Sequence, residues 1–323
     1  MQLTSGGIIA NYRCNASCRH CMYGSSPTAE NGYMTIEMAK RVCDTLLRHG
    51  CQSVHIGGGE PFLRADDLAA LVRVIRQSGL ELEYIETNAG WLSRDDARNH
   101  ETLRKVLDAG ADCIMVSVDP FHIEFVPLYK PLALLRLLQE SDTSYFVWKE
   151  QYLRTLATLD RERTYTPTEL EDALGYNIAD TCAREYGLGF NGRALNLLRR
   201  LHTRKPAEAF LTDAPCSALR DTGHFHIDFL GQYVPPRCTG IGIAMEDSGA
   251  WDSGFDAERY PVVSRLREGG LRTLHQLAQE HGFEADAGGY VSPCELCFDM
   301  RKTLVQRTEC RDLTPNAFYT QDY

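Results

Sequence analysis

The chain has 323 residues and a net charge of −10, and 43% of its residues are hydrophobic. This length and composition suffice for one large α/β domain with a smaller module. The acidic balance argues against general binding to nucleic acid or to anionic membranes, which requires a basic surface. The N-terminus lacks the features of a signal peptide, and no apolar run approaches the roughly 18 residues of a membrane helix. We therefore expect a cytoplasmic protein, in which the twelve cysteines serve metal binding or chemistry more often than disulfides.

Strand-like and helix-like segments alternate along the first half of the chain. The hydrophobic patterns predict strands within 6–14, 52–62, 82–91, 112–122 and 144–148, and helices within 34–50, 66–79, 101–110 and 131–139. Such an alternation is typical of parallel strands joined by crossover helices, as in an α/β barrel or a doubly wound sheet.

The second half is less regular. We expect a helical insertion over about 150–185, in which Thr166 caps a helix that begins at Pro167. Residues 186–201 are predicted as a sixth strand, a turn and a helix. Beyond about residue 205 the alternation of strands and helices stops. Residues 224–238 are predicted as a hairpin with a glycine turn. Residues 261–282 are predicted to be mostly helical. We therefore divide the chain into a barrel domain, 1–205, and a C-terminal module, 206–323.

Three cysteines lie close together directly after the first predicted strand. Cys14, Cys18 and Cys21 have the spacing C-x3-C-x2-C. Three soft thiolates favour an iron–sulfur cluster, and a 4Fe–4S cluster with three protein ligands keeps one iron open for a small molecule. The alternative is a zinc site whose fourth ligand comes from a distance.

This spacing after the first strand resembles that of the radical S-adenosylmethionine (SAM) superfamily, with His20 at the place where that family usually has an aromatic residue. The resemblance implies a partial (β/α)6 TIM-like barrel and SAM bound to the open iron. Reductive cleavage of SAM then yields a 5′-deoxyadenosyl radical that abstracts a hydrogen atom from the substrate. A reducing partner such as flavodoxin or ferredoxin is implied as well.

Other motifs fall where the family places its SAM contacts. The sequence "GGGEP" ends the second predicted strand, and glycine there lets a bulky cofactor approach the backbone. By the resemblance, the expected SAM-binding residues are His20, Gly58, Gly59, Glu60, Asn88, Ser117 and Arg193. Each of these motifs alone is equally compatible with an ordinary turn or with surface polar residues.

Polar residues after the fourth predicted strand are candidates for contact with the substrate. Active sites of barrels gather at the carboxyl ends of the strands, which draws attention to Asp119, His122 and Glu124. Asp119 and His122 are our candidate catalytic residues, with Cys310 as a possible hydrogen-atom donor. The alternative is a strand-ending turn with surface polar groups, and a spare thiol at position 310.

Four further cysteines follow the barrel, namely Cys216, Cys238, Cys294 and Cys297. With the hairpin "HIDFLGQYVPPRC" they resemble the twitch form of the SPASM modules, which hold auxiliary iron–sulfur clusters in radical SAM enzymes. The resemblance implies a second 4Fe–4S cluster that transfers electrons. A structural zinc ribbon is the alternative. His224, His226 and Asp228 alternate on the hairpin, as a metal trio or as ordinary strand residues.

The sequence leaves the substrate open. We expect hydrogen abstraction from a small molecule or a short peptide. Two alternatives are a peptide maturase that forms crosslinks or epimerises residues, and a non-catalytic iron–sulfur electron carrier. An electron carrier would have no need of the "GGGEP" motif.

Overall fold

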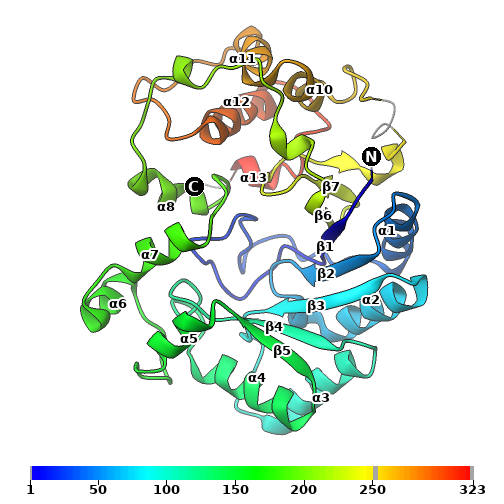
Figure 1. Cartoon of the computed structure of the whole chain (residues 1–323), viewed down its shortest axis with the longest axis vertical. Helices are drawn as coiled ribbons and strands as arrows, with labels where there is room; N and C mark the ends of the chain where they lie inside the picture. The colour runs from blue at the N-terminus through cyan, green and yellow to red at the C-terminus, as the bar shows by residue number, and fades with distance from the viewer. Residues whose placement is uncertain (1, 250–253, 321–323) are drawn as a thin grey trace.

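Five strands of the first half of the chain lie parallel, in the order β5-β4-β3-β2-β1 (Figure 1). The computed structural model describes residues 2–249 and 254–320. Its first elements are β1 (Ser5–Ile9), α1 (Ile36–Arg48), β2 (Ser53–Gly57), η1 (Pro61–Arg64), α2 (Ala65–Ser78), β3 (Glu81–Thr87), α3 (Asp96–Leu107), β4 (Cys113–Ser117), α4 (Tyr129–Glu140) and β5 (Ser144–Trp148). The α/β fold class with crossover helices is thereby confirmed.

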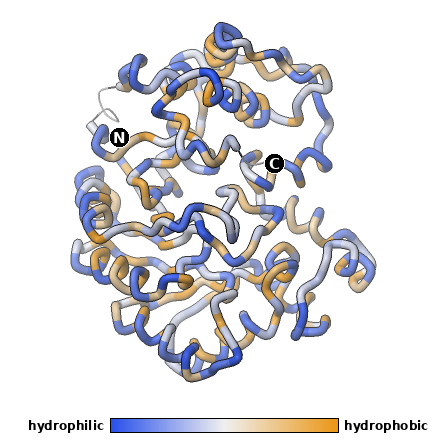
Figure 2. Tube along the Cα trace, turned by 180° about the vertical axis from the view of Figure 1, so that it is seen from behind, coloured by the Kyte–Doolittle hydropathy of each residue, from blue (hydrophilic) through white to orange (hydrophobic). Residues whose placement is uncertain are grey.

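The crossover helices are amphipathic and cover the sheet from outside. Helix α1 begins where the Thr35 hydroxyl accepts a hydrogen bond from the Met38 amide at 3.1 Å, and it buries Val42 and Leu46 against the core. Along the outer helices hydrophilic and hydrophobic residues alternate (Figure 2). Helix α2 packs against both α1 and α3, and this outer layer holds the carboxyl ends of the strands in fixed positions.

The expected helical insertion is present. It contains α5 (Glu150–Leu156), α6 (Pro167–Leu174) and α7 (Ile178–Glu185), and α8 (Ala194–Leu201) follows. Thr166 caps α6 in a capping box with Glu169, as the sequence predicts. The sixth strand expected after residue 186 is wrong, because residues 186–193 form turns and loop. Gly187 and Gly192 adopt positive φ angles there, and the Arg193 amide donates to the Cys21 carbonyl at 3.0 Å.

The sheet instead continues through the predicted hairpin. Strand β6 (Gly223–Asp228) pairs in parallel with β1, and β7 (Gln232–Val234) and β8 (Ile243–Ala244) follow in antiparallel order. Gly231 has a φ of +76° in the turn between β6 and β7. The sheet therefore contains strands from both sides of residue 205. The division into two domains at that position stays a prediction.

Helices form most of the rest of the C-terminal part (Figure 1). They are η2 (Ala207–Ala209), η3 (Ser217–Leu219), η4 (Met245–Asp247), α10 (Pro261–Glu268), α11 (Gly270–Glu280), α12 (Pro293–Arg307) and α13 (Ala317–Thr320). The helical character expected over 261–282 is confirmed. Within the described residues, no helix has the length and apolar composition needed to cross a membrane.

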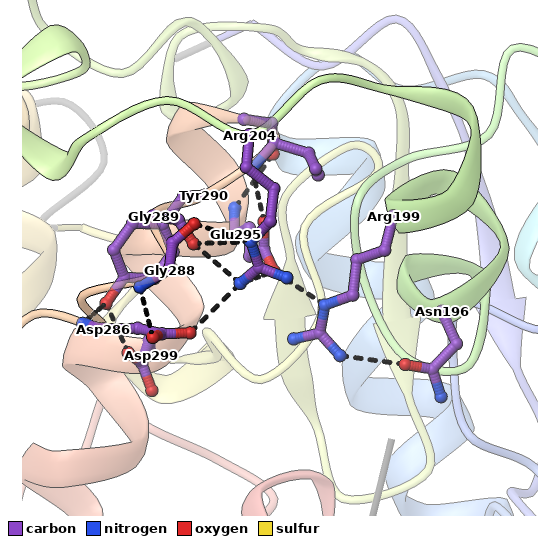
Figure 3. A network of polar contacts seen from close by, with 11 residues as sticks. Asn196, Arg199, Arg204, Asp286, Gly288, Gly289, Tyr290, Glu295 and Asp299 are labelled. Atoms are coloured by element: carbon purple, nitrogen blue, oxygen red, sulfur yellow. Dashed lines mark hydrogen bonds and ion pairs between the residues drawn. The ribbon is translucent and has the colours of Figure 1, made fainter.

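A buried carboxylate connects α12 to the segment around α8. Glu295 is 2% exposed and accepts a hydrogen bond from Arg199 Nε at 2.6 Å, while Arg204 lies on its other side (Figure 3). The Val291 amide donates to the same carboxylate at 2.6 Å. This contact fixes the first turn of α12 relative to the helix that follows the insertion.

Candidate functional site

A cavity of about 290 Å³ lies at the carboxyl ends of the parallel strands, and the three-cysteine loop forms part of its wall. The expected site residues that line it are Cys14, Cys18, His20, Cys21, Gly58, Gly59, Asn88, Ser117, Asp119, His122 and Arg193. Residues from four strand ends and from the loop before α8 thus meet in one place. This is where ligands bind in folds of parallel strands.

The thiols of the loop are suited to an iron–sulfur cluster. Burial, followed by the charge of Glu60, raises the pKa of Cys14 to about 12, and burial also raises the pKa of Cys18 well above its usual value. The Cys14 sulfur accepts hydrogen bonds from the Ala16 amide at 3.4 Å and from Asn88 Nδ2 at 3.5 Å. Without metal, these thiols keep their protons near neutral pH, so iron binding and proton release are coupled. The Nδ1 atom of His20 is also buried without a hydrogen-bond partner.

Glycines of the "GGGEP" segment bring the backbone close to the loop. Gly58 has a φ of +147°, and a Cβ atom on Gly59 would lie 2.1 Å from the Arg13 carbonyl oxygen. The Gly59 amide donates to the Asn11 carbonyl at 2.9 Å, and the Glu60 amide donates to the Arg13 carbonyl at 2.9 Å. Any side chain at position 59 would therefore displace the chain that leads into the cysteines.

Glu60 is not among the described residues that line the cavity. It is fully buried and accepts hydrogen bonds from Thr87 Oγ1 at 2.9 Å, from the Asn88 amide at 2.8 Å and from the Phe62 amide at 3.1 Å. Burial raises the pKa of Glu60 to about 7 despite these donors. Glu60 thus holds the end of β3, where Asn88 faces the cavity. Direct contact between Glu60 and SAM stays a prediction.

Asp119 is the centre of a polar cluster beside the cysteines. Its Oδ2 atom lies 2.9 Å from His122 Nδ1, 3.8 Å from His20 Nε2 and 2.9 Å from the Tyr186 hydroxyl, which donates to it. Burial alone would raise the pKa of Asp119, but the neighbouring His122 and His20 rings hold that pKa below its usual range. Burial likewise would lower the pKa of His122, but the charge and hydrogen bond of Asp119, together with the charges of Glu60 and Glu86, outweigh burial and raise that pKa. The cluster can hold a proton at His122 within the cavity.

Arg193 fastens the loop before α8 to the cysteine loop. Its Nε atom donates to the Cys18 carbonyl at 2.9 Å, and its Nη2 atom donates to the Ser25 carbonyl. Part of the side chain lines the cavity. Arg193 therefore supports the loop and adds positive charge to the cavity.

Two candidates do not reach the cavity. Cys310 is not among the described residues that line it, and the Cys310 sulfur instead lies 3.0 Å from Thr308 Oγ1. Glu124 pairs with Arg19, with distances of 2.6 to 3.1 Å between the carboxylate and guanidinium atoms. Since neither residue faces the cavity, a role in hydrogen transfer or substrate contact there has no geometric support.

The cavity also has walls that the sequence reasoning missed. They include Tyr23, Tyr84, Glu86, Trp148, Tyr186 and His224. Glu86 and Tyr84 alternate on β3, and Trp148 is the last residue of β5. The rule that strand-end residues face the active site could have found Trp148 and Glu86. Tyr186 follows α7, and no sequence signal indicated its contact with Asp119.

The four C-terminal cysteines lie near one another around a buried arginine. Burial raises the pKa of Cys238, to which Cys297, Cys216 and Cys294 add, whereas the charge of Arg301 lowers it. Arg301 is 1% exposed; Nη1 donates to the Thr239 carbonyl at 2.9 Å, and Nε is buried without a hydrogen-bond partner. A buried cation beside four thiols requires compensating negative charge, which thiolates bound to a metal cluster provide.

Most residues that line the cavity belong to a part of the chain that matches a known family model. Residues 8–158 match the family model described as the Radical SAM superfamily. A GTP 3′,8-cyclase from Klebsiella pneumoniae is 29% identical over 109 residues, which are 33% of this chain and 31% of that protein. The similarity thus spans about a third of the length of that relative.

Solved structures with a similar fold include SuiB of Streptococcus suis bound to S-adenosylmethionine. Its TM-score is 0.45 and its sequence identity 14%, and the alignment covers 91% of this chain and 75% of that one. Native anSMEcpe with bound AdoMet has a TM-score of 0.44 and 14% identity over 94% of this chain and 98% of that one. Because these TM-scores are low, no functional argument rests on them. The family model covers the cysteine loop, the glycine segment and strands β2 to β5 together, so this part of the chain is similar to the radical SAM superfamily.

Proposed function

We propose that the chain is a radical SAM enzyme that abstracts a hydrogen atom from a small molecule or a short peptide bound in the cavity. One observation carries the proposal: Cys14, Cys18 and Cys21 line the same cavity as Gly58, Gly59 and Asn88. These three thiols would hold a 4Fe–4S cluster, which would supply the electron for reductive cleavage of SAM. An electron carrier would have no use for an adjoining cavity with glycine-lined walls.

The residues around the thiols have separable roles in this proposal. The backbone of Gly58 and Gly59 leaves room for the methionyl part of SAM, and Asn88 adds an amide to the same wall. Asp119 and His122 lie two and five residues after the end of β4 and line the cavity, on the side that we assign to the substrate. There the Asp119–His122 pair orients a polar substrate group and holds a proton at His122 Nδ1.

The C-terminal thiols complete the proposal. Cys216, Cys238, Cys294 and Cys297 hold a second 4Fe–4S cluster, supported by their mutual effects on pKa and by the buried Arg301. Four protein ligands leave this cluster no open iron, so it serves electron transfer. A flavodoxin or ferredoxin is the proposed source of the first electron.

The test is cleavage of SAM by the anaerobically reconstituted protein after reduction with dithionite. We expect 5′-deoxyadenosine from the wild type and none from the Cys14→Ala/Cys18→Ala/Cys21→Ala variant. The Cys113→Ala variant is the control, because Cys113 lies at the amino end of β4, and it should cleave SAM as the wild type does. If the triple variant still produces 5′-deoxyadenosine, the cluster assignment is wrong.

A further inference from the structure

Three histidines from two strands meet beside the cavity, on a part of the sheet that the proposed SAM chemistry does not use. His55 is on β2, and His224 and His226 are on β6. One ring nitrogen from each lies within 4.8 Å of the others. His55 and His226 are buried, whereas His224 is exposed and lines the cavity.

A glycine makes this approach possible. In the sheet, Gly7 of β1 pairs with His55 on one side and with His226 on the other. A Cβ atom on Gly7 would lie 2.4 Å from His55 Nε2 and 2.5 Å from His226 Cδ2. The two imidazole rings therefore close over a residue that has no side chain, and their Nε2 atoms lie 3.3 Å apart.

A bulge in β6 directs the third ring to the same point. The register between β1 and β6 shifts so that Ser5 pairs with Gly223 and Gly6 with Phe225, which leaves His224 as the extra residue. His224 has a φ of +56°, a left-handed conformation that is uncommon for a residue other than glycine. Bulges occur next to active sites, where they redirect a side chain. Here the His224 ring stacks on His55 with the ring centroids 5.2 Å apart.

Outer contacts fix the orientation of the buried rings. The Tyr23 hydroxyl lies 3.0 Å from His226 Nδ1, and the His55 ring hydrogen-bonds the backbone of Gly6. Metal-binding histidines commonly engage their second nitrogen in this way. Zinc–nitrogen distances of about 2.0–2.1 Å in a tetrahedral site place two ligand nitrogens about 3.3–3.4 Å apart. The separation of the two Nε2 atoms matches this value.

Two acidic groups lie near the three histidines, and they differ in whether their oxygens are already engaged by other residues. Glu86 Oε1 lies 3.8 Å from His55 Nε2, and Glu86 also lines the cavity. Asp228, which the sequence grouped with His224 and His226, is engaged elsewhere: it accepts from the Tyr12 hydroxyl at 2.9 Å and from the Leu230 and Gln232 amides. The expected trio with Asp228 is therefore replaced by a trio with His55.

We propose that His55, His224 and His226 bind one divalent zinc ion whose fourth position faces the cavity. Imidazole ligands suit zinc, and three protein ligands with one open position are typical of zinc sites that bind a substrate. The open position lies on the side of His224 and Glu86, within the cavity that the cysteine loop also lines. The ion then binds an oxygen or nitrogen donor of the substrate and positions that substrate in the cavity.

The test measures zinc rather than catalysis. Anaerobic protein with its iron–sulfur clusters in place is treated with EDTA, incubated with two equivalents of zinc and freed of excess metal by gel filtration. Zinc and iron per chain are then determined, and X-ray absorption at the zinc edge gives the ligand distances. We expect about one zinc per chain with nitrogen or oxygen at about 2.0–2.1 Å, and no sulfur at about 2.3 Å.

The His224→Ala variant should lose this zinc, because it lacks one of the three proposed ligands. It should keep its iron, because His224 is exposed and its replacement should not disturb folding. The matched control is His202→Ala, which removes another exposed histidine and should keep the zinc. Three results would each overturn the proposal in favour of a hydrogen-bonded histidine pair. They are zinc with sulfur ligands, equal zinc contents in the wild type and His224→Ala, and no retained zinc in the wild type. The Cys14→Ala/Cys18→Ala/Cys21→Ala variant should still bind zinc, so this result is independent of SAM cleavage.

Discussion

Glu60 shows how a motif residue acts through its neighbours. The sequence predicts a contact between this carboxylate and the amino group of SAM, whereas the structure gives it three donors from the protein, at Phe62, Thr87 and Asn88. We therefore propose that Glu60 affects SAM binding through Asn88, whose Nδ2 atom contacts the Cys14 sulfur at 3.5 Å and Asn15 Oδ1 at 3.2 Å.

The Glu60→Gln variant should weaken SAM binding about tenfold while the iron content stays unchanged. Glu60 accepts from the Asn88 amide with Oε2 and from the Phe62 amide and the Thr87 hydroxyl with Oε1. A glutamine has a single acceptor oxygen and loses the contacts on one side, and one buried hydrogen bond to a charged group contributes about 1.5–3 kcal/mol. Equilibrium binding of SAM to the reconstituted protein measures this. The control is the Glu81→Gln variant, which changes an exposed residue of β3. An unchanged dissociation constant in Glu60→Gln would show that the end of β3 does not depend on this carboxylate.

At the residue scale, local sequence motifs predicted which residues line the cavity, whereas contacts between residues distant in sequence could not be predicted. The cysteine spacing and "GGGEP" placed Cys14, Gly58 and Gly59 correctly at one cavity, because each motif follows a strand and parallel strands end at the same edge. No local pattern indicated a role for His55, which lies in the middle of a buried strand. Its contact with His226 depends on the pairing of β2, β1 and β6, and pairing across 171 residues of sequence has no local signal.

At the scale of elements, the hydrophobic periodicity predicted the helices and the first five strands. It failed at 186–190, where an apolar segment interrupted by glycines resembled a strand. Gly189 there contacts the cysteine loop, since its amide donates to the Met22 sulfur at 3.3 Å. The sixth parallel strand is the first strand of the hairpin instead, because the unpaired edge of β1 requires a partner.

Helix α10 depends on a carboxylate that is distant in sequence. Asp312 Oδ2 accepts from the Val262 and Val263 amides, each at 2.8 Å, and burial raises the pKa of Asp312 to about 6. Because this folded-state pKa lies above the unfolded value, the folded state binds more protons between about pH 4 and pH 6. The contribution of Asp312 to stability is therefore lost as the pH rises through about 6.

The Asp312→Asn variant should remove this dependence, since asparagine retains one acceptor oxygen for the two amides. From pH 5 to pH 7, the wild type should lose about 1 kcal/mol of unfolding free energy relative to Asp312→Asn. Thermal unfolding of both proteins under anaerobic conditions across this range measures the difference. The exposed Asp44→Asn variant serves as the control and should run parallel to the wild type. Parallel curves for Asp312→Asn as well would contradict the raised pKa.

At the scale of the whole molecule, two sets of cysteines lie on one continuous sheet and its attached helices. The first set follows β1, and the second surrounds the hairpin that pairs with β1 and the first turn of α12. The contact of Glu295 with Arg199 fixes α12 relative to the segment after the insertion (Figure 3). With both proposed clusters in place, the protein should contain roughly eight irons per chain, and the variant without the first three cysteines roughly four.

The most direct test of the account is the electron paramagnetic resonance spectrum of the dithionite-reduced protein with and without SAM. We predict that SAM changes the wild-type spectrum, because it binds the open iron of the cluster on Cys14, Cys18 and Cys21. The variant with all three cysteines replaced by alanine should retain a reduced-cluster signal from the C-terminal thiols that SAM leaves unchanged. A wild-type spectrum that SAM does not alter, or a triple variant that still responds to SAM, would contradict the central claim that these three cysteines hold the SAM-binding cluster.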